Sequence, residues 1–313
     1  MPDSPRHRNH KLPHFAESFL LMGTVVTIRV VGTAKGPARK SIGRSIAAMT
    51  EVERQCSRFD ESSALRHLCR HPGDLVPVPP ALFHALRIAC EMGALTGGVF
   101  DPTVGRPLEQ MGFNRHYLTQ EAVESAGAGS PHASYRDITL FEDTLSVRLQ
   151  QPLMLDLGGV AKGLAVDLGA QALQDFEGFA IDAGGDVYVH GLDPSGELWD
   201  VGIEHPKRPD SPIRRLRVSD MAVCTSGSYK RRSPLNPGLH HLWNPITQTS
   251  AQGLLSCTVA APLAVLADAS ATAAFLSGPQ QAMDFIEKLG FAGFAVTEDW
   301  RTLETASMRR YMR

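Results

Sequence analysis

Residues 152–191 read PLMLDLGGVAKGLAVDLGAQALQDFEGFAIDAGGDVYVHG, and this stretch decides the class of fold. Its pattern predicts a strand that ends at Asp156, a glycine-rich turn, a helix that begins near Val160 and a second strand over 179–191. A strand followed by a turn, a helix and another strand is typical of domains in which helices pack on a sheet.

Periodic segments elsewhere add elements of both kinds. Apolar side chains alternate over 24–32, which predicts a half-buried strand, and they recur at helical spacing over 41–56 and 80–92. Two alternating runs around a turn predict hairpins at 136–150 and 291–308. Strands and helices are interleaved without a strict βαβ rhythm. The chain is therefore expected to be α+β, or irregular α/β, with mixed sheets and packed helices.

Composition and charge exclude several classes of protein. The chain has 313 residues, of which 43% are hydrophobic, a formal net charge of −2 and a pI near 6.6. Such a chain has no general attraction for nucleic acid or for an anionic membrane. Its longest apolar run, at 254–267, is interrupted by Pro262 and is too short to cross a bilayer. No stable membrane insertion is expected.

The N-terminus and the cysteines bear on organisation and location. Residues 1–18 are polar and predict a flexible tail, whereas 19–313 are predicted to form a single domain. The first residues contain no apolar run of the kind that a signal peptide needs. The five cysteines lack metal-binding spacing, which is typical of reduced thiols. These features predict a cytoplasmic protein.

One carboxylate lies in an unusually apolar setting. Asp268 is part of LADASATAAF at 266–275, and an ionised carboxylate among apolar residues costs several kcal/mol unless it has a partner. It could be the N-cap of a helix that starts there. It could also bind a hard cation such as Mg²⁺ together with Thr272, which lies one helical turn further on. Taken alone, the local sequence favours the N-cap, and the metal site is the alternative.

Three glycine-rich turns indicate a ligand that carries phosphates. They occupy 96–108, 155–163 and 182–191, and none matches the dinucleotide or P-loop motif. The second turn would bring Asp156 to the end of a strand and Lys162 into the first turn of a helix. A cation is unfavourable at that end of a helix dipole unless an anion binds beside it.

Eight blocks of the sequence, in this order, resemble the FAD:protein FMN transferase (ApbE) family over roughly residues 20–280. They are MGT (22–24), SRFDESSAL (57–65), TGGVFDPTVGRPL (96–108), LDLGGVAKGLAVD (155–167), DAGGDVYVHG (182–191), TSGSY (225–229), HHLWNP (240–245) and ADASATAAFLSG (267–278).

The resemblance implies an ApbE-like flavin transferase fold and a Mg²⁺-dependent enzyme. Such an enzyme moves the FMN half of FAD onto a Ser or Thr hydroxyl of an acceptor flavoprotein and releases AMP. It implies that Asp268, Thr272 and the backbone carbonyl of the Gly159 region bind the metal ion. Positions that contact FAD in the family correspond here to Met22, Phe59, Val99, Phe100, Asp101, Asp156, Lys162 and Leu242.

Three further expectations complete the comparison with the family. His241 is the candidate general base, because histidine can accept a proton near neutral pH and adjacent histidines point to opposite faces. Asn244 and Gln248 replace an Asp and a Gly of the family pattern. An FAD pyrophosphatase, which forms FMN and AMP, and an FAD-binding protein with reduced catalysis therefore stand as alternatives.

Overall fold

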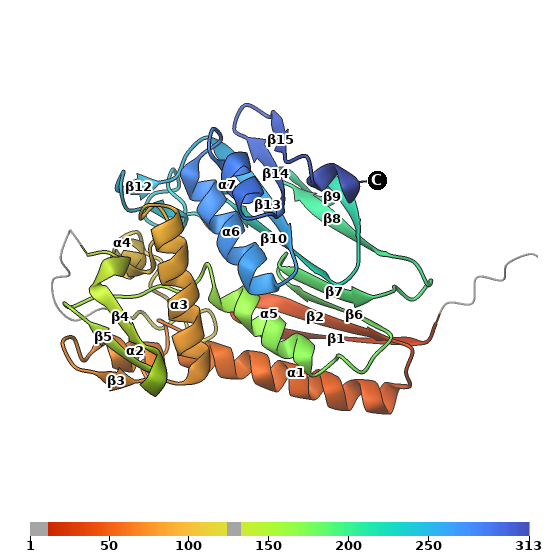
Figure 1. Cartoon of the computed structure of the whole chain (residues 1–313), viewed down its shortest axis with the longest axis horizontal. Coiled ribbons are helices and arrows are strands. Elements are labelled where there is room, and N and C mark those ends of the chain that lie inside the picture. Colours follow the sequence, from red (N-terminus) through yellow and green to blue (C-terminus); the bar gives the residue numbers. More distant parts are fainter. Residues whose placement is uncertain (1–11, 124–132, 313) are drawn as a thin grey trace, which may run out of the picture.

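The computed structural model describes residues 12–123 and 133–312, and it is built around one eight-stranded sheet (Figure 1). Every strand pairing in this sheet is antiparallel. In spatial order its strands are β1 (His14–Leu21), β2 (Thr24–Val31), β6 (Gly178–Ala183), β7 (Val187–Gly191), β10 (Met221–Gly227), β13 (Leu254–Ala261), β14 (Ala292–Thr297) and β15 (Thr302–Glu304).

Helices cover one face of the sheet. Figure 1 shows α1 beneath β1 and β2, with α5 and α6 side by side across the sheet. Alternate strand residues such as Val26, Ile28 and Val30 face these helices and join the main core. The helices are α1 (Lys35–Cys56), α2 (Ala64–Cys69), α3 (Pro80–Leu95), α4 (Gly105–Gln110), α5 (Ala161–Gln171), α6 (Ala264–Ser277) and α7 (Ala282–Lys288).

A second, smaller core lies on the opposite face. The hairpin of β8 (Trp199–His205) and β9 (Arg208–Val218) packs there against strand residues such as Val31 and Phe294. Two small sheets complete the described part of the fold. They are β3 (Val76–Pro77), β5 (Ser146–Leu149) and β4 (Ile138–Phe141), and the pair β11 (Trp243–Asn244) and β12 (Thr249–Ser250).

The structure confirms an α+β architecture of sheets and packed helices. The strand expected at 24–32 and the hairpins expected at 136–150 and 291–308 are present as β2, β4–β5 and β14–β15. The helix expected at 80–92 is α3, and it carries Pro80 in its first turn. The helix expected at 41–56 is α1, which starts earlier.

Three expectations about local structure are wrong. The second strand expected over 179–191 is a hairpin instead, because the chain turns between β6 and β7, which pair antiparallel. The segment before Asp156 is not a strand, because it bonds to a turn instead of a neighbouring strand: Asp156 N donates to Pro102 O over 2.7 Å. Residues 14–18 are not a tail, because they belong to β1 and pair with β2. The predicted tail residues 1–11 lie outside the described part of the chain.

The contact between α5 and α6 depends on Gly163. A Cβ atom at this position would lie 2.4 Å from Ala264 O and 2.6 Å from Val265 Cα. Gly163→Ala is therefore expected to lower the free energy of unfolding by about 3 kcal/mol, measured by urea denaturation. Gly43→Ala is the matched control, since Gly43 is exposed on α1 and a Cβ atom there would meet no atom within 4 Å. That control should gain up to about 1 kcal/mol, and equal effects of both changes would contradict the prediction.

Candidate active site

Three charged side chains from different elements meet where α5 and α6 are in contact. Lys162 lies in the first turn of α5, Asp186 in the β6–β7 turn and Asp268 in the second turn of α6. Lys162 Nζ forms an ion pair with Asp186 and lies 3.4 Å from Asp268 Oδ2. The backbone N–H of Gly163 donates to the same Oδ2 over 3.1 Å. Both carboxylates are only 3% exposed.

The charges of this cluster do not balance. Two carboxylates share one ammonium, which leaves one negative charge in excess when all three groups are ionised. Burial, followed by the charge of Asp186, raises the pKa of Asp268 to about 7, although Lys162 opposes this. Burial by itself would lower the pKa of Lys162, but Asp186 and Asp268 outweigh it and raise the pKa. An additional cation would therefore be favourable at this place.

Asp268 is not the N-cap of α6, so that interpretation is wrong. The helix begins at Ala264, five residues earlier than such a cap would require. Its first amides are instead bound by Asp167 of α5, whose carboxylate oxygens accept from Ala264 N over 2.8 Å and from Val265 N over 2.9 Å. Asp268 is thus inside the helix, and its carboxylate faces Lys162.

The structure brings the three predicted metal-binding residues together. Thr272 lies one turn after Asp268 on α6, and its Oγ1 is 2.8 Å from Ser226 Oγ. A Cβ atom on Gly159 would lie 3.3 Å from Thr272 Oγ1, so the backbone of Gly159 borders this hydroxyl. Within residues 12–123 and 133–312, no group of three or more His, Cys, Asp or Glu side chains could hold a metal ion. A metal here would need hydroxyl and backbone oxygens, which suit Mg²⁺.

Asp156 belongs to a second polar group. Its Oδ2 accepts from Arg58 Nε, and its Oδ1 accepts from Gly158 N over 2.8 Å. Burial would raise its pKa, but Arg58 and the Gly158 N–H together lower it. Sequence reasoning missed Arg58, which is 3% exposed. The sequence feature that could have pointed to Arg58 is its position between Cys56 and Phe59, within a block shared with the family.

Asp101 organises the glycine-rich turn after α3. Its Oδ1 accepts from Thr103 N and Thr103 Oγ1, over 2.9 and 2.8 Å, and its Oδ2 accepts from Tyr135 N over 2.9 Å. These bonds hold the loop that carries Val99 and Phe100. The Phe100 ring is buried, and its Cε2 would lie 3.2 Å from a Cβ on Gly159. The loop therefore borders the predicted metal-binding residues.

The two adjacent histidines have different surroundings. His240 is buried, and its Nε2 lies 2.8 Å from Ala251 O. His241 is half-buried, lies edge-on to Phe113 at 6.3 Å between ring centroids, and precedes the buried Leu242. Burial, then the charge of Arg231, lowers the pKa of His241 to about 3. Its imidazole is therefore neutral at physiological pH and can accept a proton, but a pKa so far below the working pH makes it a weak base.

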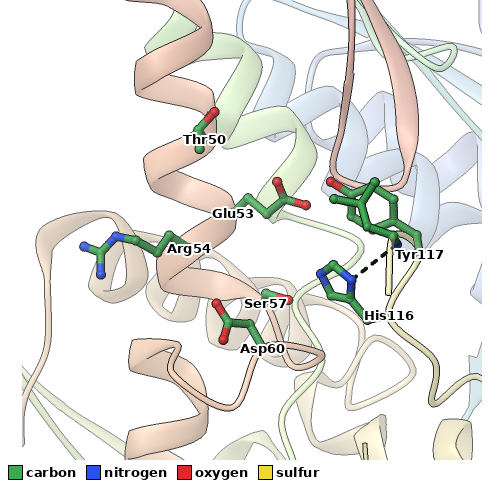
Figure 2. A pocket seen from close by; sticks show the side chains of 8 residues that line it. Thr50, Glu53, Arg54, Ser57, Asp60, His116 and Tyr117 are labelled. Carbon is green, nitrogen blue, oxygen red and sulfur yellow. Dashed lines mark hydrogen bonds between the residues drawn. The ribbon is translucent and has the colours of Figure 1, made fainter. Parts of the chain in front are cut away.

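A pocket of about 200 Å³ lies at the end of α1 (Figure 2), and the backbone N–H groups of Met22 and Phe59 donate to two of its lining residues, Glu53 and Ser57. Met22 has a left-handed backbone with φ of 53°, and its N–H donates to Glu53 Oε1 over 2.9 Å. Figure 2 shows Glu53 pointing toward Tyr117. The pocket is lined by Thr50, Glu53, Arg54, Ser57, Asp60, His116, Tyr117 and Leu118.

Asn244 and Gln248, the two departures from the expected family pattern, lie in the same turn region. Asn244 Oδ1 accepts from Ile246 N over 2.9 Å and from Thr247 N over 3.2 Å, which forms an Asx turn that needs no charge. Gln248 has φ of 53°, a conformation that favours glycine and costs about 1–2 kcal/mol for other residues. The Asx turn of Asn244 is thus followed by a strained backbone at Gln248.

Comparisons of the sequence with a family model and with curated proteins identify the same family. The model of the ApbE family matches residues 22–295. The chain is 25% identical to the FAD:protein FMN transferase of Klebsiella pneumoniae (strain 342), over 91% of this chain and 84% of that protein. It is 29% identical to the Chlamydia trachomatis (serovar D) protein of the same name, over 83% of this chain and 84% of the other.

Solved structures agree in fold. The ApbE protein of Thermotoga maritima superposes with a TM-score of 0.85 and 28% identity, covering 96% of this chain and all of that one. The apo form of the flavinyl transferase ApbE from Pseudomonas stutzeri has a TM-score of 0.79 at 23% identity, over 97% and 99% of the two chains, and supports the fold alone. Because the family match covers most of its length, the chain belongs to the ApbE family.

Proposed function

We propose that this chain is an FAD:protein FMN transferase that depends on Mg²⁺. It would move FMN from FAD onto a Ser or Thr hydroxyl of an acceptor flavoprotein and release AMP. The names of the curated relatives support transfer from FAD to protein. The observation that carries the proposal is the cluster of the half-buried Lys162 with the buried Asp186 and Asp268, which lies beside Thr272 and Gly159.

The oxygen atoms of this cluster suit a magnesium ion. Asp268, the Thr272 hydroxyl and the carbonyl of the Gly159 region would hold it, and the excess negative charge of the two carboxylates favours its binding. When bound, Mg²⁺ supplies positive charge that stabilises the diphosphate oxygens. Lys162 adds a fixed positive charge from the start of α5.

The transfer itself is a substitution at phosphorus. The acceptor hydroxyl oxygen forms a bond to the phosphorus of the FMN half, and the bond from that phosphorus to the bridging oxygen breaks, so that AMP leaves. The hydroxyl proton goes to the neutral imidazole of His241. Met22, Phe59 and Phe100 supply apolar surface for the flat rings of FAD.

His241→Gln should slow transfer by about 100-fold, since general base catalysis contributes on the order of 10²–10⁴. The dissociation constant of FAD should remain within about a factor of three, if His241 acts on the acceptor hydroxyl alone. Because its pKa is lowered to about 3, His241 should stay unprotonated between pH 5 and 8. The variant and the unmodified protein should therefore show the same pH dependence in that interval, measured as initial rates. A rate for H241Q equal to that of the unmodified protein would exclude His241 as the base.

Incubation of the purified protein with FAD, Mg²⁺ and an acceptor flavoprotein tests the proposed function. Flavin fluorescence that comigrates with the denatured acceptor, together with one AMP per label, supports transfer. AMP and free FMN without labelling indicate an FAD pyrophosphatase instead. FAD that binds without any turnover indicates a flavin-binding protein with reduced catalysis.

A further inference from the structure

Arg58 connects three segments that border the site. It is the second residue after α1 and is 3% exposed. Its Nε donates to Asp156 Oδ2, and its Nη2 donates to the backbone carbonyl of Phe113. Its guanidinium carbon lies 4.1 Å from the centroid of the Phe59 ring, within the range of a cation–π contact. One planar group therefore holds a carboxylate, a loop carbonyl and an aromatic ring in a fixed arrangement.

Each of these three contacts leads to a residue with a predicted role. Asp156 and Phe59 are positions that the family resemblance assigns to FAD. Phe113 packs edge-on against His241, the candidate base, at 6.3 Å between ring centroids. Arg58 is thus in contact with two predicted FAD-binding residues. It also contacts Phe113, which packs against the candidate base.

The hydrogen bonds of Arg58 indicate more than a stabilising role. Its Nη1 is buried and has no hydrogen-bond partner among the described residues. An unpaired buried donor costs about 1–3 kcal/mol. Replacing a buried ion pair by apolar side chains is often neutral or stabilising, so a buried pair is weak evidence for stability. The presence of an arginine here despite that cost is better explained by the geometry that it imposes on its neighbours.

We infer that Arg58 is a positioning residue for FAD, which holds Asp156 and the Phe59 ring in the orientation that the substrate requires. This inference rests on the proposed function. Arginine suits the task because its planar fork donates to two acceptors at once, whereas the ammonium of lysine is a single point charge. Arg58 itself need not touch FAD, because Asp156 and Phe59 lie between it and the substrate.

The test measures FAD affinity separately from turnover, by quenching of flavin fluorescence in the presence of Mg²⁺ and without acceptor. Arg58→Met should raise the dissociation constant about 10- to 100-fold, by analogy with the loss seen when the residues that orient metal-binding side chains are replaced. Arg58→Lys should recover less than half of the lost binding free energy. Asp156→Asn should also weaken binding, and the double variant should be much less impaired than the sum of the two single effects predicts.

Arg66 provides the matched control. It is 4% exposed, lies on α2 and pairs with Glu61, so Arg66→Met removes an equally buried guanidinium. This variant should lose thermal stability with FAD affinity unchanged within about a factor of three. If Arg58→Met does not fold, Arg58→Lys and Asp156→Asn carry the comparison.

Two results would overturn the inference. One is an Arg58→Met or Arg58→Lys variant that loses thermal stability but binds FAD with the affinity of the unmodified protein. The other is complete additivity of Arg58→Met and Asp156→Asn. Failure of the proposed function is distinguishable, because the unmodified protein would then bind no FAD or would transfer no flavin, before any variant is compared.

Discussion

Asp268→Ala is expected to reduce Mg²⁺-dependent flavin transfer by at least about 10³-fold, since a metal ion contributes several kcal/mol to stabilising the transition state. Asp268 is the only predicted metal ligand that carries a charge. Its carboxylate lies at the contact of α5 and α6, where Gly163 N and Lys162 keep it in one orientation. Without that carboxylate, Thr272 and a backbone carbonyl are too weak as ligands to hold Mg²⁺.

Metal binding is measured independently of turnover in this experiment. Mg²⁺ should raise the melting temperature of the unmodified protein, because a ligand that binds only the folded state stabilises it, and it should not raise that of Asp268→Ala. Asp268→Asn, which keeps the shape of the side chain, should behave in the same way. Asp284→Ala is the control, since Asp284 is an exposed carboxylate on the neighbouring helix α7. Normal Mg²⁺-dependent turnover by Asp268→Ala would refute the metal assignment.

Lys162→Met should lower the rate of transfer by about 10²–10³-fold, the loss typical when one charge-stabilising donor is removed from an active site. The substitution also leaves Asp186 and Asp268 without their ammonium, and breaking a buried ion pair in this way costs about 3–5 kcal/mol. A destabilised protein could lose activity for that reason alone, so the stability must be restored before the rates are compared.

The double variant Lys162→Met with Asp186→Asn separates the two effects. It removes one positive and one negative charge, so the cluster keeps its excess of one negative charge on Asp268. Its melting temperature should lie closer to that of the unmodified protein, while the rate of transfer stays low. Lys40→Met, at an exposed position of α1, controls for the loss of a lysine elsewhere. If the double variant recovers the rate along with the stability, Lys162 has no role in the chemistry.

Local patterns in the sequence predicted many of the elements and part of the site. The alternation at 24–32, the two hairpins and α3 depend on spacing within one segment, and they were found where expected. The spacing of Asp268 and Thr272 also depends on one helical turn: both lie on α6, and Thr272 borders Gly159. Family blocks in the right order added the expected fold, which the solved relatives bear out.

Local sequence patterns do not show contacts between residues that lie far apart in the chain. The glycine-rich turn at 182–191 gives no sign that Asp186 belongs to the site, although its carboxylate is the closest partner of Lys162. The strand expected before Asp156 was wrong because an extended apolar segment can bond to a turn as well as to a strand. The N-cap interpretation of Asp268 was wrong because α6 starts earlier and takes its cap from another helix.

The sequence by itself determined the elements with a local period, the one-turn spacing of Asp268 and Thr272, and the resemblance to a family. Only the tertiary structure decided which charges meet. Arg58 and Asp156 are 98 residues apart, Gly163 and Asp268 are 105 apart, and Asp167 and Ala264 are 97 apart. Periodicity shows which face of an element is buried, but it carries no information about what lies opposite that face. The neighbour of each face depends on the order of the strands in the sheet and on the close contact between α5 and α6, which the absence of a Cβ atom at Gly163 allows.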